Sequence, residues 1–121
     1  MKIIIKRGHI AHEDDRRTIQ ELYNGDFTAR QIKILFVKTR SVLGNHYHPY
    51  SQFFFILKGR ASYEFYDMIT NEKKSVKMKR GDYVQIGPNI AHAALMNKGT
   101  ITLEGNEQPF DPSKDIKYDL L

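Results

Sequence analysis

Short stretches of hydrophobic residues, many alternating with polar ones, follow one another along this chain and are separated by turns rich in glycine, asparagine and proline. The expected strands cover residues 3–5, 18–23, 31–39, 52–57, 61–66, 75–78, 83–86, 91–96 and 100–104. Alternation with a period of two is typical of strands with one buried face. In no stretch is a helix-capping residue followed by hydrophobic residues at the helical period of 3.6. Residues 13–22 have some helical character, but Thr18 and Ile19 disfavour a helix. The pattern therefore predicts an all-β sandwich or barrel.

The turns and the two most hydrophobic strands add detail to this expectation. Residues 58–60 are expected to form a hairpin turn, and residues 97–99 another one, while 9–17 and the tail from residue 109 are expected to be irregular. Residues 31–39 predict a mostly buried strand with two alternating sets, Ile32, Ile34 and Phe36 against Lys33, Leu35 and Val37. In 52–57, Phe54 and Ile56 are expected to face inward and Phe53, Phe55 and Leu57 outward. Apolar residues on both faces require cover from a second sheet or a second subunit.

Composition narrows the class of protein. The 121 residues fit one domain, 1–121, and the absence of cysteine excludes disulfides, thiolate metal sites and cysteine nucleophiles. The net charge of +5 favours anionic partners. The basic residues are scattered, without an arginine-rich arm or a helix–turn–helix pattern, so a small anionic substrate is expected rather than nucleic acid. A solvated basic surface without a specific partner is the alternative. The three isoleucines near the N-terminus are too few for a signal peptide or membrane span, which predicts a cytoplasmic protein without membrane contact.

Three histidines occupy the most informative positions of the sequence. His46 and His48 are two residues apart, so in a strand both imidazoles project from one face. Gln52 shares that face if the strand continues through Pro49, and His92 lies near the start of a later strand. Three imidazoles and an amide oxygen suit a divalent first-row transition metal such as Zn, Ni, Fe, Mn or Co. His46, His48, Gln52 and His92 are therefore candidate metal ligands, although each also has a purely structural interpretation.

The order of these residues resembles the cupin superfamily. Its first motif corresponds to about residues 44–59, with His46, His48, Gln52 in place of the usual glutamate, and Gly59. Its second motif corresponds to about residues 81–97, with Gly81, Gly87-Pro88-Asn89, His92 and Asn97. The resemblance implies a single-domain, jelly-roll-like antiparallel β-barrel in which His92 faces His46 and His48. It also implies a homodimer.

Within the cupins, the chain is similar to small sugar-nucleotide 3,4-ketoisomerases and epimerases of deoxysugar biosynthesis. The similar segments include 15–17, 44–48, 86–90, 102–104, 110–111 and 118–119. The resemblance implies an isomerase or epimerase of a nucleotide-linked keto-deoxysugar, with His46 and His48 as catalytic residues and no organic cofactor. His48 is the first candidate for the base that removes a proton next to the ketone, and His46 is its partner. By charge, Lys38, Arg40 and Arg60 are candidates for holding the diphosphate.

Two alternatives remain open at this level. An imidazole nitrogen bound to a metal cannot accept a proton, so His46 and His48 are either metal ligands or proton-transfer groups at those nitrogens. A metal-dependent enzyme resembling a small oxygenase is therefore the first alternative. A non-enzymatic cupin that binds a metal or a small ligand is the second, because a fold does not determine a function.

Overall fold

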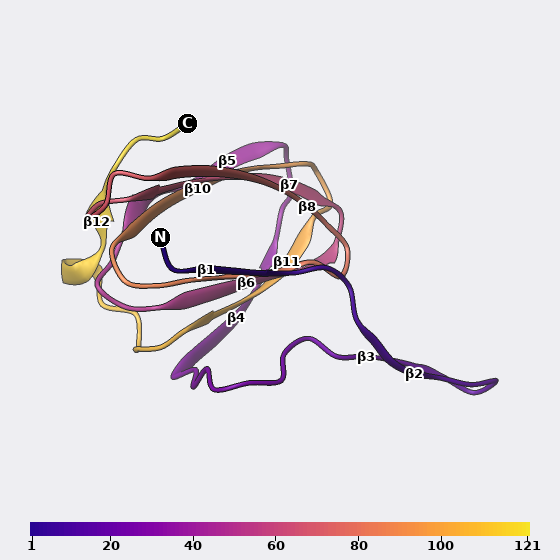
Figure 1. Ribbon diagram of the computed structural model, residues 1–121. Coiled ribbons are helices and arrows are strands. Elements are labelled where there is room, and N and C mark those ends of the chain that lie inside the picture. The colour runs from indigo at the N-terminus through magenta and orange to yellow at the C-terminus, as the bar shows by residue number, and fades with distance from the viewer.

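The computed structural model describes all 121 residues, which form twelve β-strands, one short 3₁₀ helix and no α-helix. Two five-stranded antiparallel sheets face each other and form a flattened barrel (Figure 1). The lower sheet in this view consists of β1 (Ile3–Lys6), β9 (Tyr83–Ile86), β6 (Gln52–Lys58), β11 (Ile101–Asn106) and β4 (Gln31–Phe36), in that order. The upper sheet consists of β12 (Ile116–Lys117), β5 (Ser41–Tyr47), β10 (Ile90–Met96), β7 (Arg60–Asp67) and β8 (Lys73–Lys79). The predicted all-β, jelly-roll-like fold is thereby confirmed.

The two predicted hairpins are wrong, because both connections lead from one sheet to the other. β6 and β7 are joined by Gly59 alone, yet β6 pairs with β9 and β11 whereas β7 pairs with β10 and β8. β10 and β11 likewise lie in different sheets. Gly59 has a φ of 90°, and a side chain there would collide with Thr100. A glycine at such a corner lets the chain turn sharply enough to change sheets.

The main core lies between the sheets and includes Phe54 and Ile56, as predicted. Phe53 and Phe55 point outward, also as predicted, and form a second cluster with Tyr83. This second cluster is covered by side chains of the segment between β3 (Thr18–Gln20) and β4, namely Leu22, Tyr23, Phe27 and Ala29. Cover for the outer face of β6 therefore comes from the same chain.

The predicted burial of β4 is wrong on one face. Ile32, Ile34 and Phe36 are 63%, 51% and 65% exposed, whereas Leu35 packs against the main core and Val37 is buried. The reason is the position of β4 at the edge of its sheet, with β11 as its sole neighbour and nothing over its outer face. An exposed apolar stripe of this kind is unusual for a free surface.

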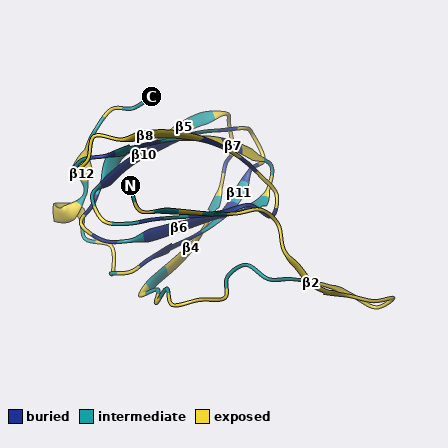
Figure 2. Ribbon diagram, viewed as in Figure 1, coloured by how far each residue is buried: buried dark blue, intermediate teal, exposed yellow.

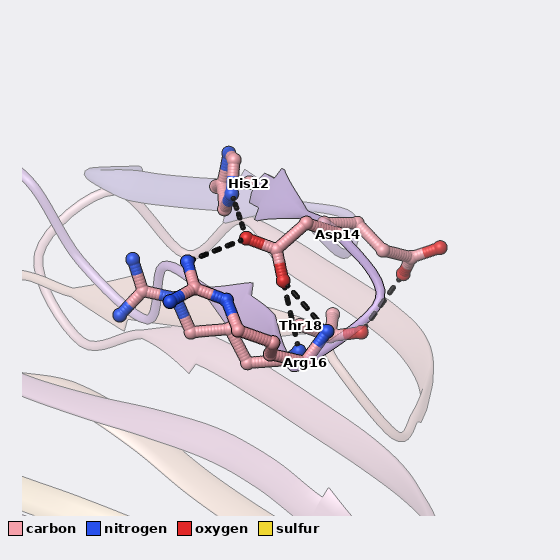
Figure 3. Close-up of polar contacts among 6 residues, drawn as sticks. His12, Asp14, Arg16 and Thr18 are labelled. Carbon is pink, nitrogen blue, oxygen red and sulfur yellow. Dashed lines mark hydrogen bonds and ion pairs between the residues drawn. The ribbon is translucent and has the colours of Figure 1, made fainter.

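Residues 9–20 form a projecting arm rather than a loop or helix. β2 (Ile10–Glu13) pairs with β3 in a two-stranded sheet that extends away from the barrel and is almost entirely exposed (Figures 1 and 2). At its tip, the Asp14 carboxylate accepts hydrogen bonds from the backbone N–H of Arg16 at 2.8 Å and from its guanidinium at 3.2 Å (Figure 3). His12 Nε2 lies 2.9 Å from the same carboxylate. These contacts hold the turn between β2 and β3.

The C-terminal tail is more regular than expected. A 3₁₀ helix (Pro112–Lys114) leads into β12, which pairs with the end of β5. Asn45 then fixes the last residues, because its side-chain oxygen accepts hydrogen bonds from the backbone N–H groups of Leu120 and Leu121 at 2.8 and 3.0 Å. No helix in the structure has the length and apolar character needed to cross a membrane.

Candidate active site

The candidate site lies inside the barrel, where β5 ends and β10 begins. Gly44 and Asn45 both have positive φ, 92° and 59°, and the pairing of β5 with β10 shifts register between His92 and Ala93. A side chain on Gly44 would lie 2.7 Å from the His92 carbonyl oxygen, so this close approach of the two backbones requires glycine. The irregularity brings His46 directly opposite His92.

The three histidines converge as predicted. The ring centroids of His46 and His92 lie 4.7 Å apart, those of His48 and His92 5.1 Å, and those of His46 and His48 5.3 Å. His48 follows the end of β5, and its carbonyl oxygen accepts a 2.9 Å hydrogen bond from the backbone N–H of Asn89. Asn89 has a φ of 61°, which asparagine tolerates better than most residues. Tyr47 points away from the cluster and packs against Tyr118.

The histidines line a cavity of about 210 Å³ between the two sheets. Six buried side-chain polar atoms in the whole chain have no hydrogen-bond partner, and all six belong to residues that line this cavity: Tyr50 Oη, Gln52 Oε1, Tyr63 Oη, His92 Nε2, Asn106 Oδ1 and Asp115 Oδ1. Leaving a buried polar atom unpaired costs about 1–3 kcal/mol. Their concentration in one place is therefore typical of a site built to bind a polar ligand.

His92 has a defined tautomer. Its Nδ1 lies 3.0 Å from the carbonyl oxygen of Ile90, and because a carbonyl can only accept, Nδ1 carries the hydrogen. Nε2 then presents a lone pair to the cavity. Burial, together with the nearby His46 and His48, lowers the pKa of His92 well below its usual value, so the ring is neutral at pH 7.

His48 is also neutral at pH 7. Burial, followed by repulsion from His46, lowers the pKa of His48 to about 4, although Asp115 opposes the shift. Its ring stacks on Tyr50 with centroids 4.4 Å apart and an interplanar angle of 6°. The stacking fixes the orientation of this neutral ring.

His46 is the most accessible of the three and lies beside a carboxylate that the sequence did not indicate. Its Nδ1 is 3.1 Å from Asp115 Oδ1, an ion-pair distance, although the ring N–H is not aligned with the oxygen as in a hydrogen bond. Asp115 is held there by the docked tail, whose Tyr118 N–H donates to the Asn45 carbonyl at 2.8 Å. A carboxylate beside one ring nitrogen orients the imidazole and stabilises its charged form during proton transfer.

The wall opposite the histidines is formed by the other sheet. Lys33 from β4, Gln52 from β6, and Glu104 and Asn106 from β11 line this side. Thr102, Glu104 and Asn106 are buried and alternate with the outward-packing Leu103, which places a carboxylate in the cavity. The alternation 102–104–106 was visible in the sequence, but nothing there showed that it faces the histidines.

The histidine cluster meets the requirements of a metal site in part. The nearest donor atoms of His46, His48 and His92 all lie within 4.8 Å of one another. Across a metal with bonds of about 2.1 Å, two donors are at most about 4.2 Å apart, so the rings would have to close slightly. Gln52 Oε1 is buried without a partner and offers a fourth donor, although β5 and β6 are separate strands and Pro49 interrupts them.

The structure does not bring Lys38, Arg40 and Arg60 to the cavity. None of the three lines it. All three are exposed at the opposite end of the barrel, near the corner where Gly59 meets Thr100. Arg40 precedes β5, six residues from His46, which is about 20 Å along a strand. Their predicted role in holding the diphosphate has no support from these positions.

Comparison with known proteins agrees with this geometry. A sequence profile described as the Cupin domain matches residues 35–105, more than half of the chain and including both histidine-bearing segments. The chain belongs to the cupin domain family. No curated protein matches the sequence of this cupin.

Several solved structures share the fold of this cupin at low sequence identity. ChmJ, a 3′-monoepimerase from Streptomyces bikiniensis solved with dTDP-quinovose, is 16% identical with a TM-score of 0.85 over 98% of this chain and 70% of that one. WlaRA, a TDP-fucose-3,4-ketoisomerase from Campylobacter jejuni, is 19% identical with a TM-score of 0.81, covering 98% and 90%. A 3,4-ketoisomerase from Helicobacter canadensis is 20% identical with a TM-score of 0.82, covering 96% and 90%.

Proposed function

We propose that this cupin is an isomerase or epimerase that moves a proton next to the ketone of a nucleotide-linked keto-deoxysugar. One observation carries the proposal: three imidazoles, one of them beside a carboxylate, converge in the cavity between the two sheets. Histidine suits both removal and return of a proton near neutral pH. The structural neighbours named above include two 3,4-ketoisomerases and an epimerase; one of them was solved with dTDP-quinovose and another is named for TDP-fucose.

In the proposed reaction, His48 and His46 divide the proton transfer. His48 is neutral, so it accepts the proton from the carbon next to the carbonyl, and the electron pair of the broken C–H bond moves into an enolate. His46 exchanges protons with the intermediate while Asp115 stabilises its charged form. Returning the proton re-forms a ketone, so no oxidant, reductant or cofactor is consumed.

The cavity fits the sugar ring but not the nucleotide. Its volume of about 210 Å³ lies below the range of about 300–1,000 Å³ typical of pockets for drug-sized ligands. The six unpaired polar atoms match a ring that carries hydroxyl and carbonyl groups. The nucleotide must then lie outside, where the half-exposed ring of Phe110 offers a surface on which a base can stack. Lys33, which also lines the cavity, supplies a cation for the diphosphate.

The test is proton exchange with solvent. The purified protein is incubated in D₂O with dTDP-4-keto-6-deoxyglucose, and loss of the hydrogens next to the ketone is followed by ¹H NMR. We expect protein-dependent exchange, reduced at least about 100-fold in His48→Asn and in His46→Asn. His9→Asn, an exposed histidine outside the cavity, is the matched control and should exchange like the wild type. Wild-type protein that neither exchanges these hydrogens nor is thermally stabilised by dTDP would contradict the proposal.

A metal-dependent enzyme is the second candidate function. It is favoured by the His92 tautomer, since a backbone carbonyl on Nδ1 is a common outer-shell partner of a metal-binding imidazole. A bound metal would be held by His46, His48, His92 and Gln52 and would polarise a carbonyl oxygen. Elemental analysis of the purified protein discriminates the two, because less than 0.1 metal per chain with unchanged melting in EDTA would exclude this candidate.

We also propose that the protein is a homodimer formed through the arm and the outer face of β4. An isolated two-stranded sheet is marginally stable in water, yet the arm exposes Ile10 and Ile19. The exposed stripe Ile32, Ile34 and Phe36 is a matching apolar surface. Light scattering after size exclusion should give twice the chain mass, and Ile34→Asp should give a monomer. A monomeric wild type at 100 µM would contradict the proposal.

A further inference from the structure

The two walls of the cavity carry different chemistry. His46 and His92 project from the sheet that contains β5 and β10, and His48 follows the end of β5 beside them, whereas Lys33 and Glu104 project from the sheet that contains β4 and β11. A flat sugar enolate held between the sheets therefore presents one face to imidazoles and the other to an amine and a carboxyl group. Lys33 and Glu104 are the titratable side chains that line this second wall.

The carboxyl group of Glu104 is buried in this wall and accepts only one hydrogen bond. The residue is 7% exposed, and Oε2 accepts one hydrogen bond, from the Thr102 hydroxyl at 3.0 Å. Oε1 lies 4.0 Å from Lys33 Nζ, the outer limit of an ion pair. Burial raises the pKa of Glu104, and Lys33 and then Thr102 oppose the shift. A carboxyl group that serves only to hold the fold is normally paired more completely than this.

We propose that Glu104 is the acid that delivers a proton to the sugar from the face opposite the histidines. This inference rests on the proposed function and makes it more specific: the reaction is an epimerisation. A histidine removes the hydrogen from the carbon next to the ketone as a proton, leaving the enolate. The Glu104 O–H bond then breaks, its proton bonds to the same carbon from the other side, and the ketone re-forms. The histidine and Glu104 return to their starting states by exchanging protons with water.

Glu104→Gln separates the two half-reactions. The substitution keeps the size of the side chain and an oxygen to accept the Thr102 hydrogen bond, but it removes the transferable proton. With dTDP-4-keto-6-deoxyglucose in D₂O, wild-type protein should give a product with inverted configuration that carries deuterium at the inverted carbon. The variant should still exchange the hydrogen for deuterium with retention, within about threefold of the wild-type rate, while the inverted product forms at least about 100-fold more slowly.

Three comparisons decide the result. Glu107→Gln, an exposed glutamate just beyond β11, should behave like the wild type in both measurements. Lys33→Met should raise KM without separating exchange from inversion; if it instead reproduces the Glu104→Gln pattern, Glu104 only positions Lys33 and the inference is wrong. Equal loss of exchange and inversion in Glu104→Gln, with an unchanged melting temperature, also overturns it.

The wild type distinguishes failure of this inference from failure of the proposed function. Exchange that is accompanied only by transfer of the ketone to the neighbouring carbon overturns the role of Glu104 and leaves the proposed function intact, because a single wall can complete that shift. Absence of exchange by the wild type overturns both.

Discussion

Replacing Tyr63 with phenylalanine should make the protein more stable and the proposed reaction slower. Tyr63 is 2% exposed, and its hydroxyl oxygen is buried without a hydrogen-bond partner. Its ring stacks on Phe65, with centroids 5.6 Å apart, and packs against Phe54 at 5.2 Å. Phenylalanine preserves both ring contacts and removes only the unpaired hydroxyl group.

The expected magnitude follows from that single atom. An unpaired buried hydroxyl costs about 1–3 kcal/mol, and deleting it breaks no hydrogen bond within the protein. We therefore expect the free energy of unfolding to rise by about 1 kcal/mol or more. For a chain of 121 residues this corresponds to a rise in Tm of roughly 3–6 °C. The reaction should slow because Tyr63 lines the cavity in which we propose that the sugar ring binds.

Urea unfolding followed by circular dichroism, supported by thermal melts, measures the change. Tyr66→Phe is the matched control, because the Tyr66 hydroxyl donates a 2.7 Å hydrogen bond to Asn71 Oδ1 and its loss should destabilise the protein by about 0.5–1.5 kcal/mol. Both substitutions remove a tyrosine hydroxyl group, but the first should raise the free energy of unfolding and the second should lower it. A Tyr63→Phe variant that is no more stable than the wild type, beside a destabilised Tyr66→Phe, would refute the reasoning.

Three further predictions concern the histidine cluster. His48→Gln should make the stability of the metal-free protein less sensitive to acid. The pKa of His48 is about 4 in the folded state and 6.5 in the unfolded state. As the pH falls from about 6.5 to 4, protonation therefore stabilises the unfolded state of the wild type and lowers its free energy of unfolding. Urea titrations in EDTA at pH 7.5 and 4.5 should show this difference as about 1–2 kcal/mol, after allowance for screening. Gly44→Ala should be less stable to urea than Gly99→Ala by at least about 1 kcal/mol, since both positions have positive φ but only Gly44 faces a backbone oxygen at 2.7 Å. Asp115→Asn should lower kcat at least about tenfold in the D₂O exchange assay with little change in Tm, because it removes the charge beside the reacting imidazole but not the tail's other contacts.

The convergence of the histidines could be predicted, because two independent constraints led to it. Strand periodicity places His46 and His48 on one face, and the cupin resemblance places His92 opposite them. The structure adds a detail that periodicity omits: His48 lies beyond the end of β5, and the bulge at Gly44 and Asn45 aligns His46 with His92. The sequence motif identifies the histidines. The backbone irregularity that aligns them depends on positive φ angles at Gly44 and Asn45, which glycine and asparagine adopt more readily than most residues.

The pairing of strands could not be predicted from local signals. Short glycine turns between hydrophobic strands normally indicate hairpins, and residues 58–60 and 97–99 both have that appearance. In a two-layer fold, short glycine-containing turns also connect strands of different sheets, because a positive φ at Gly59 or Gly99 allows the chain to leave one sheet for the other. The sequence alone predicts the turn but not which of the two sheets contains the next strand. The same limitation hid the exposed face of β4, whose alternation is identical whether its partner surface is a core, a second subunit or water.

The cations illustrate why function required the structure. A net charge of +5 predicts an anionic partner but does not say which cations contact it, and Lys38, Arg40 and Arg60, the three predicted from the sequence, do not line the histidine cavity. Lys33, by contrast, does not stand out in the sequence, where it is one charge in a hydrophobic strand. In an edge strand, an inward-pointing lysine commonly protects the edge from pairing with another chain. Protection of that kind needs no counter-charge. Its position on the cavity wall opposite the histidines, 4.0 Å from the buried carboxyl group of Glu104, instead agrees with the role in ligand binding that we propose for it.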